Sequence, residues 1–163
     1  MPEQLFDYVG PREIAERAKS VRFRVDSAQS LGEHVRSESP KGSSVTFTFV
    51  IDRNRELWIA DRRSEHVACA RGGPVLAAGE LTVEGSDGEI AGITNQSTGF
   101  CPKGESWSVV AQVLGDLGIF HPDGWTFEFE FRRCPNCKQI QVIKENDFEC
   151  PVCEEELPRE WNF

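Results

Sequence analysis

The stretch SVTFTFVIDRNRELWIAD, residues 44–61, decides the fold because it contains two strands and the turn between them. Val45, Phe47, Phe49 and Ile51 recur at every second position of its first half, the period-two pattern of a half-buried strand. The second half, RELWIAD, has strand composition again and follows the turn residues DRNR. The stretch therefore predicts a β-hairpin, and with it an antiparallel sheet.

Further strand patterns lie on both sides of this hairpin. VRFRVD (21–26) alternates apolar and charged residues, and GELTVEG with EIAGITNQS (79–97) predicts a second hairpin. WTFEFEF (125–131) has an aromatic residue at every second position, which predicts a strand with one buried face. The aromatic residues on that face are Trp125, Phe127, Phe129 and Phe131.

Helical patterns are fewer than strand patterns. Residues 11–20 begin with a proline and predict a short helix, and residues 107–117 carry apolar side chains at helical spacing before Gly118. Residues 27–38 are ambiguous, because their apolar spacing suits a helix that Gly32 weakens. Together the patterns predict an α+β fold: a largely antiparallel sheet with a few helices over residues 1–131, and a smaller module packed on it over residues 132–163.

The small module is predicted from CPNCKQIQVIKENDFECPVC, residues 134–153. Two C-x-x-C turns bring four thiolates around one ion in a tetrahedron, with Cys134, Cys137, Cys150 and Cys153 as ligands. QIQVI and DFE are expected to form two short strands on either side of the turn KEND. Because all four ligands are protein thiolates, we expect one bound Zn²⁺ with a structural role. Iron bound by the same four sulfurs is the alternative that the sequence leaves open.

The repeated C-P-x-C pair resembles the zinc-ribbon or rubredoxin-like knuckle family over about residues 132–157. That resemblance implies a metal site and no particular activity. Lys138 and Glu154 stand where many ribbons place glycine, so the knuckle backbone departs from the family pattern there. The rest of the chain carries no such resemblance.

A second candidate site is predicted in NQSTGFCPKGESW, residues 95–107. Pro102 is expected in the first turn of the following helix, so Cys101 would lie at a helix N-terminus as a nucleophile or beside an anionic ligand. The alternative is a turn with Cys101 buried as a small apolar residue. Arginines in residues 62–71 would complete an anion pocket if both loops lie at one end of the sheet. The predicted ligand-binding residues are Arg62, Arg63, Arg71, Asn95, Gln96, Ser97, Thr98 and Cys101.

Composition narrows the function classes. The formal net charge is −9 and no segment of the chain is basic, which disfavours a nucleic-acid partner. No secretory signal or membrane-spanning run is recognised, and the paired cysteines suit a reducing compartment, so a cytoplasmic location is predicted. We interpret the chain as a zinc-binding interaction or adaptor protein with a protein partner. The alternative is a small enzyme or sensor of a nucleotide-like anion.

Overall fold

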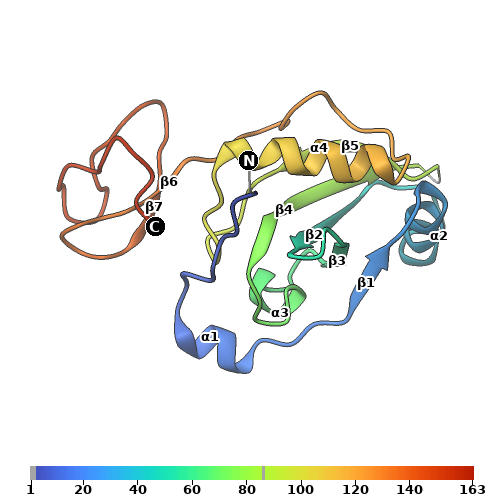
Figure 1. The fold of residues 1–163 in the computed structure, drawn as a ribbon, viewed down its shortest axis with the longest axis horizontal. Coiled ribbons are helices and arrows are strands. Elements are labelled where there is room, and N and C mark those ends of the chain that lie inside the picture. Colours follow the sequence, from blue (N-terminus) through green and yellow to red (C-terminus); the bar gives the residue numbers. More distant parts are fainter. Residues whose placement is uncertain (1–2, 86) are drawn as a thin grey trace.

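A five-stranded antiparallel sheet forms the centre of the protein, in a computed structural model that describes residues 3–85 and 87–163 (Figure 1). The strand order is β1-β3-β2-β4-β5. The α+β fold with an antiparallel sheet is thus confirmed. The strands are β1 (Arg22–Val25), β2 (Val45–Asp52), β3 (Leu57–Asp61), β4 (Val75–Glu84) and β5 (Glu89–Thr94).

The β2–β3 hairpin forms as its sequence predicts. Ile51 is paired with Leu57 and Phe49 with Ile59, and all four side chains are buried. β2 also pairs with β4 along its length, so the strand that decides the fold is central in the sheet. The predicted second hairpin is formed by β4 and β5.

Two helices cover the first face of the sheet. Helix α2 (Ala28–Glu38) resolves the ambiguous segment: Ser27 and Ser30 form a capping box that fixes its start, while Leu31 and Val35 pack into the core. Helix α4 (Trp107–Asp116) lies along β4 and β5 and ends before Gly118, which has the positive φ typical of a helix C-terminus (Figure 1). This side holds the larger hydrophobic cluster.

The second face of the sheet is covered over only part of its area. The N-terminal segment with α1 (Arg12–Arg17), the short helix α3 (His66–Cys69) and Phe100 pack against Val50 and Val75. Beyond this cluster the face carries threonines, among them Thr46, which is hydrogen bonded to Thr82. The protein therefore has one complete apolar layer and one partial layer.

The prediction of a strand with a buried aromatic face at residues 125–131 is wrong. Only an isolated bridge joins Phe127 to Thr94 of β5, and Phe127 is 61% exposed. The side chains of Thr126 and Asn95 form the hydrogen bonds that a strand ladder would otherwise make with this segment. Among the four aromatic residues, only Phe131 is fully buried.

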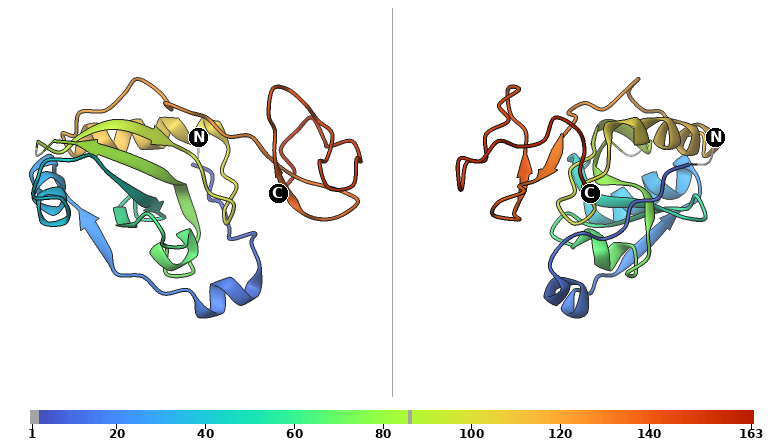
Figure 2. Two further views of the ribbon diagram at one scale, coloured as in Figure 1. Left: turned by 180° about the vertical axis from the view of Figure 1, so that it is seen from behind. Right: turned by 60° about the vertical axis from the view of Figure 1, so that its left-hand side comes forward.

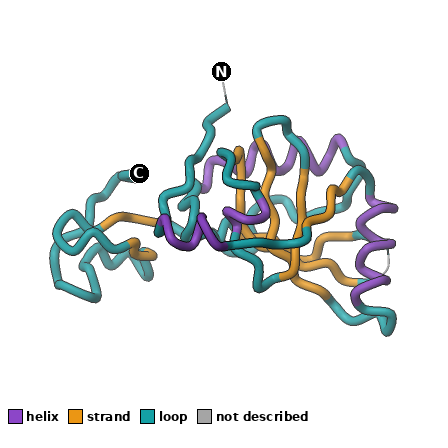
Figure 3. Tube along the Cα trace, turned by 90° about the horizontal axis from the view of Figure 1, so that it is seen from below, coloured by secondary structure: helices purple, strands orange, loops and turns teal. Residues whose placement is uncertain are grey.

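The chain from β6 (Phe131–Arg133) to the C-terminus forms a separate lobe beside the sheet (Figures 2 and 3). We call it the C-terminal lobe, and the part of the chain before it the body. The second strand of this lobe is β7 (Ile140–Val142). QIQVI contains β7 as expected, whereas the expectation of a strand at DFE is wrong, because the first C-x-x-C turn connects β6 to β7 and these two strands pair with each other. Only an isolated bridge, between Lys144 and Asp147, closes the turn KEND.

Within the described residues, no helix has the length and apolar character needed to cross a bilayer.

Close packing of β4 against the end of β5 gives a test of this fold. A Cβ at Gly79 would collide with the backbone carbonyl of Thr94, whereas a Cβ at Gly115 on α4 meets nothing. We expect Gly79→Ala to lower the free energy of unfolding by about 2 kcal/mol, the cost of forcing a buried backbone apart. Gly115→Ala should raise it by up to about 1 kcal/mol, because alanine favours a helix. Urea unfolding measures both, and equal effects would contradict the strand packing.

Candidate metal centre

Four cysteine sulfurs converge in the C-terminal lobe. The Sγ atoms of Cys134, Cys137, Cys150 and Cys153 all lie within 4.8 Å of one another. The Cys134–Cys153 and Cys137–Cys150 pairs are 3.5 Å and 3.7 Å apart. A tetrahedral ion with Zn–S bonds of about 2.3 Å requires sulfurs about 3.8 Å apart, so the four residues fit zinc. All four cysteines are free thiols, and the predicted metal ligands are brought together.

The two C-x-x-C turns have the same backbone geometry. The N–H of Lys138 donates to the carbonyl of Cys134 at 3.0 Å, and that of Glu154 donates to Cys150 at 2.8 Å. Lys138 and Glu154 have φ values of 65° and 67°. At both positions an exposed L-residue adopts the left-handed conformation that glycine adopts without strain, at a cost of about 1 kcal/mol each. The two turns therefore share one backbone shape although neither has a glycine at this position.

Protons compete with the metal for these sulfurs. Hydrogen bonds from the Asn136 side chain and the Glu155 backbone lower the pKa of Cys153 to about 6. The pKa of Cys137 is raised to about 11: the largest influence, a backbone hydrogen bond from Gln139, lowers it, but desolvation and hydrogen bonds to the other three cysteines outweigh that. At neutral pH the metal-free cluster thus keeps protons that zinc must displace. Zinc affinity is expected to fall as the pH falls.

The lobe has only a small hydrophobic core of its own. Leu157 is buried beside Cys134 and Cys150, with Phe148 and Ile143 packed around them. So few apolar side chains cannot offset the conformational entropy of an ordered segment of this length. Metal ligation would supply the missing stability, which is the role of a closed four-thiolate site.

Two consecutive arginines anchor the lobe where it leaves the body. Arg132 is 4% exposed, and its guanidinium donates to the carbonyls of Phe131, Pro158 and Arg159 and to the carboxylate of Glu130. Burial of a guanidinium is tolerated when its donors are satisfied in this way. Its partners join the entering strand to the tail that leaves the second C-x-x-C turn.

Arg133 and Asn162 extend the same connection to the main domain. Arg133 donates to the carbonyl of Val9, and its backbone N–H and carbonyl both pair with the Asn162 side chain. The entering strand, the tail and the N-terminal segment are therefore tied together at one place. Both arginines lie within the segment of the ribbon resemblance, but the C-x-x-C pattern assigns no role to either of them.

The C-terminal tail also docks directly on the body. The indole N–H of Trp161 donates to the carbonyl of Cys101 at 2.8 Å, and its ring packs edge-on against Phe6. The ammonium of Lys103 lies 4.7 Å from the centre of the Trp161 ring. Sequence patterns do not single out this tryptophan, and its only signal is a large aromatic residue in a tail that is rich in charged residues. The prediction that the ribbon packs on the main domain matches these contacts, while the exact domain boundary stays a prediction.

Buried side chains of the loop of residues 95–101 form hydrogen bonds with backbone groups of the loop itself and of other segments. Asn95 is fully buried and bonds both backbone groups of Phe129 and the carbonyl of Pro102. The Ser97 hydroxyl is also buried and accepts the N–H of Phe100. These polar side chains therefore have partners within the protein, and among residues 95–98 only Thr98 is exposed and Gln96 partly exposed.

Cys101 is not at the start of a helix. A 3₁₀ turn, η1 (Gly104–Ser106), precedes α4, so the expectation that Pro102 lies in the first helical turn is wrong. Cys101 is fully buried, and burial raises the pKa of its thiol to about 12. Cys69 is buried as well, with its pKa also raised to about 12 by burial. Neither thiol is ionised at neutral pH, which favours the apolar alternative for Cys101.

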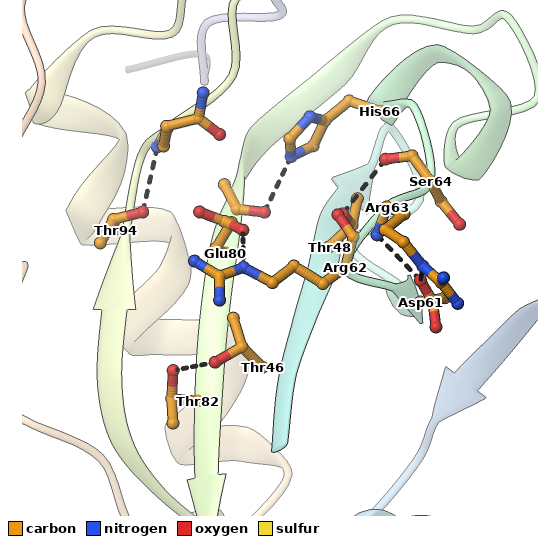
Figure 4. A network of polar contacts seen from close by, with 12 residues as sticks. Thr46, Thr48, Asp61, Arg62, Arg63, Ser64, His66, Glu80, Thr82 and Thr94 are labelled. Carbon is orange, nitrogen blue, oxygen red and sulfur yellow. Dashed lines mark hydrogen bonds and ion pairs between the residues drawn. The ribbon is translucent and has the colours of Figure 1, made fainter. Parts of the chain in front are cut away.

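The arginines proposed as anion ligands are paired or distant. Arg62 pairs with Glu80 at 3.0 Å, and Arg63 pairs with Asp61 at 3.1 Å (Figure 4). Glu80 is the register partner of Thr94, whose hydroxyl accepts the N–H of Gln96. Arg62 and the start of the 95–101 loop therefore share one face of the sheet, whereas Arg71 follows α3 at the end of a separate turn.

Removal of two ligands tests the metal centre. We expect Cys134→Ser with Cys137→Ser to reduce zinc from one ion per chain to near zero, because two thiolates cannot complete the tetrahedron. Limited proteolysis should then cut the C-terminal lobe while the body stays protected. Cys101→Ala, which keeps all four ligands, should retain one zinc. Elemental analysis that still finds one ion in the double variant would show that other residues bind the metal.

Comparison with known proteins provides no relative for this chain: no family model, no curated protein and no solved structure matches it.

Proposed function

We propose that the protein is a zinc-stabilised interaction protein. A structural ion holds the C-terminal lobe, with the tail that follows Cys153, against the body, and the two parts together form one partner-binding surface. The supporting observation is the hydrogen bond from Trp161 to the carbonyl of Cys101. It links the tail that follows the last two metal ligands to the body, so metal binding and the shape of the shared surface are coupled. A reducing compartment such as the cytoplasm would keep the four cysteines from forming disulfides, so that they can bind the ion.

The electrostatics and the chemistry of the cysteines support the same reading. A net charge of −9 favours association with a basic or neutral partner. A four-thiolate site leaves no coordination position for substrate or water, so the metal would act by folding the lobe. The buried thiols Cys69 and Cys101 have pKa values of about 12, which makes them poor nucleophiles.

Zinc-dependent capture of a partner tests this proposal. We expect the tagged wild-type chain to retain a stoichiometric protein partner from its native cell extract. Cys134→Ser with Cys137→Ser should lose that partner although its body remains folded, since the surface needs an ordered ribbon. Circular dichroism of the purified variant checks the body. Capture that is unchanged without zinc, or no stoichiometric partner at all, would contradict the proposal.

A second candidate function is recognition of an anionic small molecule on the exposed polar part of the sheet. It is favoured by one observation: Arg62 donates to Glu80, and Glu80 is the register partner of Thr94 (Figure 4). The hydroxyl of Thr94 in turn accepts the N–H of Gln96. An anion would have to displace Glu80 from Arg62, which is 65% exposed and therefore free to turn.

A thermal-shift series tests the second candidate. Pyrophosphate and a nucleoside triphosphate should raise the melting temperature of wild type by a few degrees if the anion binds the folded state. Arg62→Ala should abolish the shift, while Arg36→Ala on α2 should keep it. A flat response in the wild type at millimolar ligand would remove this candidate.

A further inference from the structure

A cleft of about 530 Å³ lies where the body meets the ribbon. One wall is the turn before α4, from Pro102 to Glu105, and another is the extended segment from Glu128 to Arg132. The tail closes it with Arg159, Glu160 and Trp161. This volume is in the range of sites that bind small molecules or a few peptide side chains. The tail supplies one wall of the cleft.

The cations of the cleft already have partners inside the protein. Arg132 is buried and hydrogen bonded to Glu130 and to three carbonyls. Lys103 lies over the ring of Trp161, and the guanidinium of Arg159 lies 4.3 Å from the centre of the Phe148 ring. These contacts hold the three cations in place but do not remove their charge, and the cleft lining sets four carboxylates, those of Glu105, Glu128, Glu130 and Glu160, against them.

The carboxylates of the cleft have no such partners. Within the described part of the chain, the side chains of Glu105, Glu128 and Glu160 form no hydrogen bond or ion pair, and all three residues are exposed. Only Glu130 is engaged, by Arg132. Unpaired carboxylates on the walls of one cleft produce a negative potential that selects a cationic ligand.

Aromatic rings complete the lining. Phe129 and Trp161 both border the cleft, and because Lys103 already lies over the Trp161 ring, Phe129 is the ring offered to a ligand. An arginine guanidinium can stack on an aromatic ring while it donates two hydrogen bonds to a carboxylate, which a lysine ammonium cannot do. We propose that this cleft binds an arginine-bearing basic segment of a partner protein. The inference rests on the proposed interaction function and names its binding site.

Other ligands fit the cleft less well. A nucleic acid or a small anion would meet three unpaired carboxylates. A divalent metal needs ligand atoms that converge on one point, and among the described residues only the four cysteines form such a group. Charge complementarity therefore selects a basic peptide over the other ligand classes.

Binding of a short peptide to the zinc-loaded full chain tests the inference. The probe is a fluorescent peptide of alternating arginine and leucine, and its control carries glutamate in place of arginine. Fluorescence anisotropy near physiological salt should give saturable binding with a Kd below about 100 µM. Glu128→Gln with Glu160→Gln should raise that Kd at least about tenfold, because two ion pairs are lost.

A matched variant controls for unspecific charge attraction. Glu89→Gln with Asp116→Asn removes two exposed carboxylates outside the cleft lining and should leave the Kd within about twofold. Zinc content and melting temperature should be those of wild type in both variants, because all four side chains are exposed. Equal loss in both variants, or binding of the glutamate peptide, or no saturable binding, would overturn the cleft assignment. If zinc-dependent partner capture persists in Glu128→Gln with Glu160→Gln, the proposed function stands and the cleft inference fails.

Discussion

The convergence of four sulfurs on one point is the constraint on which the C-terminal lobe depends. The lobe built around Cys134 and Cys150 buries too little apolar surface to fold by itself. Two turns of equal backbone geometry bring the sulfurs to distances that suit a tetrahedral zinc ion. Once the second turn is fixed, the tail that follows it has a defined direction, and Trp161 reaches the body.

The loop of residues 95–101 connects the body to the segments on either side of the metal ligands. This loop is rich in polar groups, yet its buried side chains bond the protein's own backbone. Asn95 holds the crossing segment at Phe129, and the carbonyl of Cys101 receives the indole of Trp161. The loop therefore positions both segments that border the cleft between body and ribbon. Polar residues that resemble a ligand site act here as a connection between two parts of the protein.

Short sequence patterns predicted correctly those features whose geometry depends on residues close together in the chain. Alternation in 44–61 indicated the central hairpin, and the C-x-x-C spacing indicated the metal ligands, because in both cases neighbouring residues determine the geometry. The aromatic alternation of 125–131 misled, since its exposure depends on the distant Asn95 and on the edge of β5. The roles of Arg132 and Trp161 depend on contacts between segments far apart in the sequence, so no local pattern could predict them.

X-ray absorption at the zinc edge of the purified full chain tests the central claim most directly. The account predicts four sulfur neighbours at about 2.3 Å and no nitrogen or oxygen in the first shell, as a closed structural site requires. A spectrum with three or fewer sulfurs and one oxygen would reveal an open position, and the metal would then be available for chemistry. That result would contradict the proposed structural role of the ion and the proposal that it holds the C-terminal lobe against the body.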